Sequence, residues 1–254
     1  MNLKIIVATH KKYWMPKDEI YLPIHAGAAG KKSIGYAGDD TGENISHKNP
    51  NYCELTAHYW GWKNLKADYI GLVHYRRYFT TREDTMESMK RWNILDAEKW
   101  ENLLQDSPVI VPGKRKYYIE SNYSHYIHAH HKEPLDVTGE IIKEEYPEYA
   151  KAWYKVMNRT WAHMFNMFVM RKDFFDRYSE YLFDILGELE KRVDISSYDE
   201  QEARVYGYVS ELMLDVWLET NDIPYKEQNV TFMENQNWLK KGGRFLWRKI
   251  KGNF

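Results

Sequence analysis

Two adjacent arginines follow an apolar stretch of the chain in the sequence GLVHYRRYF (71–79), which contains His74, Arg76 and Arg77. A guanidinium group presents a fork of donors that matches two phosphate oxygens at once. A fixed cation also stabilises a diphosphate leaving group, which gains negative charge as its bond breaks. We therefore predict that these three residues bind a diphosphate. The alternative is a pair of surface arginines that face carboxylates.

Two other apolar segments also end in polar side chains. Thr9 and His10 follow one of them, and Asp39 and Asp40 follow the other. Carboxylates can hold ribose hydroxyls, a base edge or a divalent cation. Neighbouring aspartates in an extended segment point in opposite directions, which suits them poorly to chelating one metal together. We predict that these four residues help to hold a nucleoside and that no metal cofactor is required. A divalent metal and a simple solvated turn are the alternatives.

The segment DEQEARVYGYVSE (199–211) supplies the candidate for catalysis. In a continuous helix, Arg204 and Glu211 would lie two turns apart on one face. Gly207 lowers helix stability by about 1 kcal/mol relative to alanine, which indicates a close approach at this position. We predict that Glu211 is a general base, with Asp199 as the alternative, and that Arg204 contacts the sugar or acceptor. A buried Arg204–Glu211 ion pair is the competing interpretation.

Two polar residues interrupt the otherwise apolar segment WAHMFNMFVM (161–170), namely His163 and Asn166. If these side chains are buried, their imidazole and amide groups must find hydrogen-bond partners. We predict that both contact the transferred sugar or the acceptor. Hydrogen bonds within the core are the alternative.

Four histidines crowd into the segment SHYIHAHHKE (124–133). Such a cluster suggests a metal site, but no cysteine is near and only Glu133 and Asp136 could assist. We favour a polar, aromatic loop that covers the acceptor side of the site, with a plain surface loop as the alternative. The histidines are His125, His128, His130 and His131.

Composition excludes several classes of protein. Hydrophobic residues make up 43% of the chain and the formal net charge is only -1, so disorder and general nucleic-acid binding both fit poorly. The sequence has no Walker loop, GxGxxG, paired CxxC or GxSxG motif. The single cysteine, Cys53, favours a reducing compartment. The short apolar run near the N-terminus suits neither a signal peptide nor a membrane span, so we expect a cytoplasmic protein.

Alternating strands and helices must position these residues. The sequence predicts strands at 3–10, 33–40, 68–75, 108–112 and 166–172, and helices at 51–64, 96–106, 138–146, 147–157, 172–193 and 199–220. This order predicts an α/β domain with a mainly parallel central sheet flanked by helices. Ligands of such sheets bind beyond the carboxyl ends of the strands. The polar groups that follow the strands are therefore expected to converge on one crevice.

The C-terminal segment differs in composition from the rest. Residues 237–254 contain six Lys or Arg residues and no acid, interleaved with aromatic side chains. This composition is typical of a peripheral anchor on an anionic membrane surface, although a tail docked on the domain is the alternative. We accordingly divide the chain into one domain at 1–235 and a basic aromatic tail at 236–254.

Several long motifs resemble a bacterial family known as domain of unknown function 4422. They are KIIVATHKKYWMP, YLPIHAGAA, GDDTGENIS, NPNYCELTAHYWGWKN, DYIGLVHYRRYF, NMFVM and SELMLDVWLE. Members of that family occur among capsule and exopolysaccharide biosynthesis proteins, and some are regarded as galactofuranosyltransferases. The resemblance implies a single GT-A-like glycosyltransferase domain. It also implies that HYRRYF stands where metal-dependent relatives of the fold carry a DxD motif.

From the residues and the resemblance together, we expect transfer of a sugar, with galactofuranose as the candidate, from a UDP-sugar donor. The expected acceptor is a lipid-linked oligosaccharide at the inner face of the cell membrane. A non-catalytic subunit that binds nucleotide sugars or glycans is the main alternative, and a nucleotide-sugar hydrolase or phosphotransferase is another. Neither the linkage nor the oligomeric state follows from the sequence.

Overall fold

A computed structural model describes residues 1–234, so the expected membrane anchor at 236–254 lies outside the described residues. Its main sheet has the strand order β10-β6-β9-β4-β1-β2-β3. Only β9 runs antiparallel to its neighbours in this row, which confirms the mainly parallel sheet. The bounds are β1 (Leu3–Thr9), β2 (Tyr21–His25), β3 (Ala37–Gly38), β4 (Tyr69–His74), β6 (Val109–Pro112), β9 (Phe168–Arg171) and β10 (Lys226–Gln228).

Two short strands continue the sheet at the carboxyl end of β4. Strand β5 (Arg77–Phe79) folds back on β4, and β11 (Val230–Phe232) pairs with β5. His74 lies opposite Arg77, so Tyr75 and Arg76 form the tip of a tight turn. A separate two-stranded antiparallel sheet pairs β7 (Arg115–Lys116) with β8 (Trp161–Ala162). Arg77 lies in β5 and Arg115 lies in β7.

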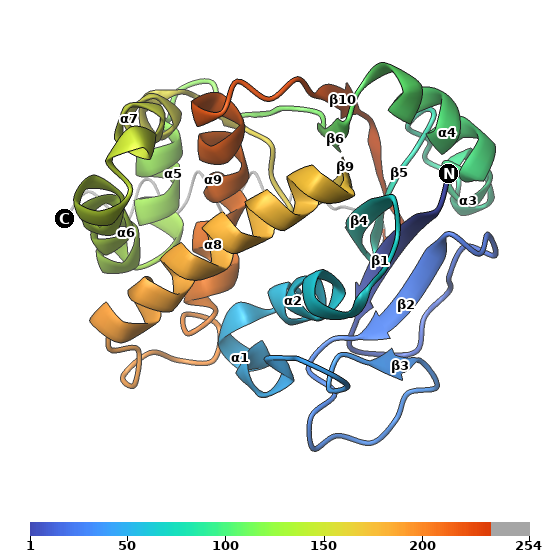
Figure 1. Cartoon of the computed structure of the whole chain (residues 1–254), viewed down its shortest axis with the longest axis horizontal. Helices are drawn as coiled ribbons and strands as arrows, with labels where there is room; N and C mark the ends of the chain where they lie inside the picture. The colour runs from blue at the N-terminus through green and yellow to red at the C-terminus, as the bar shows by residue number, and fades with distance from the viewer. Residues whose placement is uncertain (235–254) are drawn as a thin grey trace.

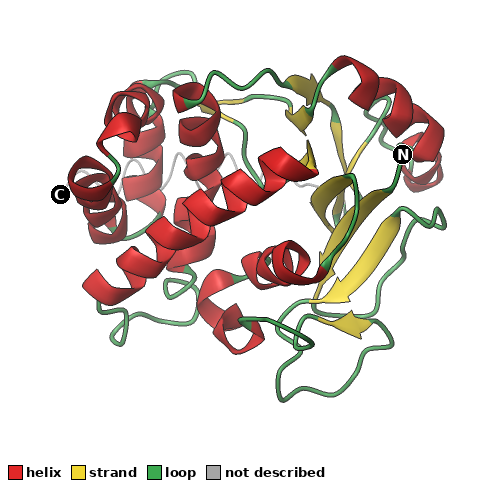
Figure 2. Cartoon of the chain, in the orientation of Figure 1, coloured by secondary structure: helices red, strands yellow, loops and turns green. Residues whose placement is uncertain are grey.

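The helices gather mainly on one side of the sheet, and α8 crosses the molecule diagonally in Figure 1. Figure 2 separates the helices in red from the strands in yellow. The helices are α1 (Asn49–Tyr52), α2 (Leu55–Asn64), α3 (Glu87–Asn93), α4 (Ala97–Asp106), α5 (Asn122–Ala129), α6 (Lys132–Glu145), α7 (Ala150–Asn158), α8 (Lys172–Arg192) and α9 (Val205–Thr220). Single 3-10 turns occur at Ser46–Lys48 and Pro147–Tyr149.

Alternating side chains of β1 build two cores, one on each face of the sheet. Ile6 and Ala8 pack with the α8 and α9 side, whereas Ile5 and Val7 pack with Trp100 of α4 on the other face. Successive side chains of a strand point to opposite faces, which explains the split. The carboxyl ends of β1, β2, β3 and β4 therefore open on one edge that lies between these layers.

None of the helices in residues 1–234 has an apolar stretch long enough to cross a membrane.

Several predicted elements differ from those observed. The helix predicted at 51–64 is broken at Cys53, whose φ of 53° lies outside the helical region. The helix predicted at 199–220 begins only at Val205, and the loop predicted at 124–133 consists largely of helix α5. Strand β2 escaped prediction because it contains Pro23. Strand β3 pairs only with Ile24 and His25, so this proline lies on an uncovered part of the edge.

Candidate active site

Cations surround His10 at the carboxyl ends of β1 and β4. Burial lowers the pKa of His10, and repulsion from four cations lowers it further. Three of them come from segments that are far apart in the sequence: Lys31 after β2, Arg76 at the β4–β5 turn and Arg204 before α9. The fourth is Lys11, whose ammonium nitrogen lies 5.3 Å from the centre of the Tyr75 ring. We call His10, Lys11, Lys31, Arg76 and Arg204 the cationic rim.

The two adjacent arginines diverge because they occupy different positions of the hairpin. Arg76 is exposed at the turn, where it belongs to the cationic rim. Arg77 is half-buried in β5, with its guanidinium carbon 4.6 Å from the centre of the Phe165 ring and 5.7 Å from that of Phe232. Burial lowers the pKa of Arg77, while Glu211 and Glu54 act to raise it. Arg77 therefore faces inward, toward two carboxylates.

Glu54 and Glu211 form what we call the carboxylate pair. Burial raises the pKa of Glu211 to about 7, and the neighbouring charge of Glu54 adds to this increase. Arg77 and Arg115 oppose it, as does a hydrogen bond from the backbone of Phe165. A carboxyl group with a pKa near neutrality is well placed to take a proton, because both protonation states are populated at the working pH.

Glu54 is held in place by two side chains, Asn166 and His74, which come from different segments. Its Oε1 accepts a hydrogen bond of 2.7 Å from Nδ2 of Asn166 and lies 3.8 Å from Nε2 of His74. Nε2 of His74 donates to the carbonyl of Phe165 at 2.7 Å, and burial lowers the pKa of this histidine. Asn166 also donates to the carbonyl of Gly207 and accepts from the hydroxyl of Ser210. The network ties the α1–α2 junction to β4 and α9.

Backbone strain gathers at the same place. Cys53, Phe165 and Asn166 have φ values of 53°, 85° and 51°, and they are three of the five non-glycine residues with positive φ in the part of the chain that the structure describes. Such conformations cost of order 1–3 kcal/mol each and persist where the surroundings impose them. Each of the three residues contacts a member of the network or rim. Local strain thus marks the region that carries the charged groups.

Gly207 makes the close approach that its position predicts. A Cβ atom at this residue would lie 3.1 Å from the sulfur of Cys53, so α9 packs directly against the α1–α2 junction. Arg204 donates from Nε to the same sulfur over 3.1 Å. Arg204 caps the beginning of α9 and contacts Cys53 and Gln201, whereas Glu211 interacts with Arg77 and Arg115. The structure therefore does not support the competing Arg204–Glu211 ion pair.

Glu234 places a carboxylate on the cationic rim. Its oxygens lie 3.3 Å from Nη1 of Arg76 and 4.0 Å from Nζ of Lys11. The backbone of the preceding residue, Met233, donates to the carbonyl of Arg76. The end of the described chain thus brings an anion to Arg76, one of the residues predicted to meet a diphosphate, and to the neighbouring Lys11.

The predicted nucleoside-binding residues occupy different environments. The hydroxyl of Thr9 bonds to the backbone of Lys11 and shapes the turn after β1. The carboxylate of Asp39 is fully buried and accepts hydrogen bonds from Gly27, Ala28 and Ser46, so it stabilises the loop after β2. Asp40 is exposed, as expected for a neighbour that points the other way. Of the two aspartates, only Asp40 has its side chain open to a ligand.

His163 belongs to a separate buried group. Its Nδ1 lies 2.6 Å from a carboxylate oxygen of Asp215, and the same carboxylate pairs with Arg159 at 2.6 Å. Asp215 follows Glu211 by one turn of α9, about 6 Å along the helix axis. The structure thus gives His163 a partner in the core, the carboxylate of Asp215. The residue predicted to contact a sugar therefore lies outside the hydrogen-bond network around Glu54.

Asp199 does not open α9, contrary to the sequence-based expectation. It is exposed in the turns before the helix, and its carboxylate accepts from the backbone of Gln201 and Glu202. These two bonds cap the short turn at 200–203, and α9 begins only after that turn, at Val205. Glu211, rather than Asp199, adjoins the cations and the strained backbone.

Sequence reasoning missed Glu54 and Arg115. Glu54 carried a signal, because it stands directly after a cysteine within a motif of the family resemblance. Arg115 stands in a short basic segment whose sequence pattern indicated neither binding nor catalysis. Both reach the site only through tertiary packing.

In residues 1–234, no three His, Cys, Asp or Glu side chains are grouped as a metal site would require.

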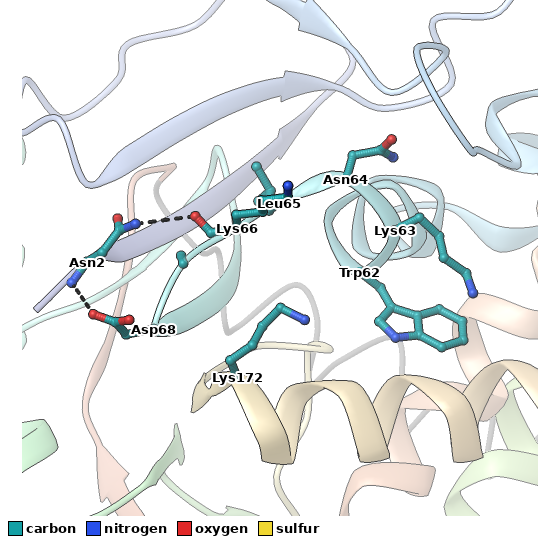
Figure 3. Close-up of a pocket in the computed structure, with 9 residues that line it drawn as sticks. Asn2, Trp62, Lys63, Asn64, Leu65, Lys66, Asp68 and Lys172 are labelled. Carbon is teal, nitrogen blue, oxygen red and sulfur yellow. Dashed lines mark hydrogen bonds between the residues drawn. The ribbon is translucent and has the colours of Figure 1, made fainter.

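An open recess shown in Figure 3 lies at the opposite end of the sheet. Its lining includes Asn2, Asp68 and Lys172, which stand at the amino ends of β1 and β4 and directly after β9. Ligands of parallel sheets bind at the other edge, where the cationic rim lies. Charge and strain therefore identify the candidate site better than this hollow does.

Comparison with known proteins identifies the family and the fold of the chain. A family model described as "Domain of unknown function (DUF4422)" matches residues 4–222. The apo structure of WbbM, a bifunctional glycosyltransferase, is similar with a TM-score of 0.85 and 35% sequence identity. The similarity covers 92% of this chain and 46% of WbbM, so the chain spans about half the length of that protein. No curated protein matches the sequence.

The fold is therefore the mixed α/β fold found in a glycosyltransferase structure. The cationic rim and the carboxylate pair both lie inside the range that the family model matches. The chain belongs to the DUF4422 family.

Proposed function

We propose that this protein is a glycosyltransferase that moves a sugar from a UDP-sugar to a glycan acceptor. The observation that carries the proposal is the meeting of a cationic rim with a carboxyl group of pKa about 7 at the carboxyl edge of the sheet. Cations suit the diphosphate of a nucleotide sugar, and the carboxyl group suits deprotonation of an acceptor hydroxyl. The similarity to WbbM supports the same reaction class.

In this mechanism Glu211 takes the proton from the acceptor hydroxyl as its oxygen attacks the anomeric carbon of the donor. The bond between that carbon and the diphosphate oxygen breaks, and UDP leaves with the bonding electron pair. The rim, which includes Arg76 and Lys11, stabilises the charge on the leaving diphosphate. Arg77 holds the carboxylate pair and keeps Glu211 partly deprotonated at neutral pH. Asp40 and His10 lie at the strand ends where the nucleoside would bind.

Galactofuranose is the candidate donor sugar, and a lipid-linked oligosaccharide at the cytoplasmic membrane surface is the candidate acceptor. Both come from the family resemblance and from the composition of the C-terminal segment. We further propose that the cations of the rim take the place of a divalent metal on the diphosphate, because the guanidinium fork matches phosphate oxygens directly.

The test is a turnover assay with a panel of UDP-sugars, including the furanose form of UDP-galactose, in the presence of EDTA. We expect one donor to yield UDP and a glycosylated product. Most of the turnover rate should persist in the presence of EDTA. Free sugar as the only product would indicate a hydrolase. Binding of UDP-sugars without any turnover would indicate a non-catalytic binding subunit. Loss of the rate with EDTA and its recovery with Mn²⁺ would contradict the metal-free mechanism.

Replacing Glu234 should strengthen nucleotide binding. The Glu234→Gln variant removes the negative charge near Arg76 and Lys11, so a diphosphate no longer competes with it. Exposed ion pairs contribute about 0–1 kcal/mol, so we expect UDP to bind at most about fivefold more tightly in titration calorimetry. Glu144→Gln is the matched control, because Glu144 is exposed on α6 and pairs with Arg192 at the end of α8. Unchanged or weaker UDP binding in Glu234→Gln would contradict the competition.

A further inference from the structure

Three histidine–tyrosine pairs stack face to face beside the candidate site. The ring centres of Tyr117 and His125 are 3.9 Å apart, and those of His130 and Tyr208 are also 3.9 Å apart. The third pair joins His131 with Tyr198 at 4.1 Å. Their interplanar angles are 26°, 24° and 19°. We call these six residues the histidine–tyrosine surface.

Helix α5 sets the spacing of this surface. His125 lies on the helix, while His130 and His131 follow its last residue, Ala129. A rise of 1.5 Å per residue separates the first pair from the others by about 8–9 Å along the helix direction. The surface is therefore extended, with room for more than one small ring.

Both ends of α5 connect the surface to the candidate site. The guanidinium of Arg204, a member of the cationic rim, lies 5.4 Å from the centre of the Tyr208 ring. On the other side, Arg115 lies 5.4 Å from the centre of the Tyr117 ring and acts on the pKa of Glu211. Two of the three stacked pairs therefore adjoin cations of the candidate site, and Tyr117 is the ring beside the cation that acts on Glu211.

Tyr117 has a hydrogen-bonding group that the described residues leave unused. Its hydroxyl is buried and has no hydrogen-bond partner in residues 1–234. Burial raises the pKa of Tyr117 to about 12, and Glu211 contributes to the increase. The phenol is therefore a neutral donor near the candidate base, and a buried hydroxyl without a partner is costly unless a ligand supplies one.

Carboxylates border the stacked rings. Glu120 is 5% exposed and accepts from Nδ1 of both His125 and His128, at 3.1 and 2.9 Å. Glu202 lies 3.2 Å from Nε2 of His131, and Glu133 accepts from the hydroxyl of Tyr198 at 3.5 Å. Carboxylates repel phosphate-rich partners such as nucleic acid or an anionic lipid surface, but they accept hydrogen bonds from sugar hydroxyls.

We propose that the histidine–tyrosine surface binds the glycan acceptor over several sugar units, with Tyr117 nearest the reacting hydroxyl and Tyr198 farthest from it. This inference rests on the proposed transferase function and names its acceptor site. Flat aromatic rings stack on the apolar faces of sugar rings, while the histidines and bordering carboxylates meet the hydroxyls.

The test is binding of purified protein to an array of linear oligosaccharides of increasing length. The array contains glucose, N-acetylglucosamine, rhamnose and galactose in both ring forms. For the wild type, we expect affinity to increase with length for at least one series. His131→Ala and Tyr198→Ala should each weaken binding of the longest oligosaccharide about tenfold, as expected for loss of a well-packed anchor. Tyr117→Phe should weaken binding of short and long members alike.

Tyr154→Ala is the matched control, because Tyr154 is 73% exposed on α7 and lies outside the surface. Thermal unfolding with and without UDP checks that each variant is folded. If Tyr198→Ala unfolds, the test rests on binding by His131→Ala, because His131 is exposed. A wild type whose affinity does not increase with length would overturn the proposal, as would variants that bind like Tyr154→Ala. UDP-sugar turnover is measured separately, so failure of the transferase function remains distinguishable from failure of this surface.

Discussion

Replacing Glu211 with glutamine should reduce turnover by about 10²–10⁴-fold, the range that a general base contributes. The substitution is nearly isosteric, so the contacts of α9 should persist and UDP binding should remain. In the wild type, kcat/KM should rise with pH through about 7, because only the deprotonated carboxylate of Glu211 can accept a proton. The residual rate of the variant should lose this dependence. Initial rates across pH 5.5–8.5 measure both effects.

The control for this experiment is Glu219→Gln on the same helix. Glu219 is exposed and pairs with Lys155 on α7, far along α9 from the carboxylate pair. We expect wild-type rates from it. A stable Glu211→Gln variant with wild-type turnover would exclude this residue as the base and return attention to Glu54 and Asp199.

Replacing Arg77 with alanine should reduce kcat/KM by about 10–150-fold, which corresponds to the roughly 1.5–3 kcal/mol of a lost interaction with a charged group. It should also change the pH profile in a definite direction. Arg77 lowers the pKa of Glu211, so its removal should raise that pKa and move the rising limb of the profile to higher pH. Activity at neutral pH then falls partly because less of the base is deprotonated, and a higher pH restores part of it.

Two further variants separate charge from geometry. Arg77→Lys keeps the positive charge but loses the guanidinium fork, so it should retain the wild-type pH profile with a reduced rate. Arg76→Ala should instead weaken UDP binding with little change in the pH profile, because Arg76 lies on the exposed rim. Thermal unfolding verifies each fold. Identical pH profiles for Arg77→Ala and the wild type would refute the proposed coupling to Glu211.

Local sequence patterns were sufficient to predict the layered fold. Runs such as LKIIVAT and YIGLVH are short, apolar and rich in β-branched residues, and both are strands with the expected bounds within one or two residues. The Asp96 cap and amphipathic pattern likewise placed α4 correctly. These features depend on neighbours along the chain. The polar residues after the strands could therefore be assigned to one edge of the sheet.

Elements that rely on distant partners escaped prediction. Cys53 breaks a helix-like sequence because α9 packs against it through Gly207, a residue more than 150 positions later. Strand β5 is only three residues long and exists because β4 and β11 pair with it. Neither feature has a local signal, since the stabilising contacts come from other parts of the fold.

For the site, the sequence by itself determined which chemical groups are available: a pair of arginines after one strand, a carboxylate on the last helix and polar residues at the other strand ends. The tertiary structure decided what they do. It turned Arg76 outward and Arg77 inward, buried Asp39 as a loop anchor and joined Glu54 to Glu211. The physical reason is that the pKa of a carboxyl group depends on its burial and on charges within a few ångströms. Folding brings the groups that set this environment together from five distant segments, as the positions of Glu54, Arg77, Arg115, Phe165 and Glu211 show.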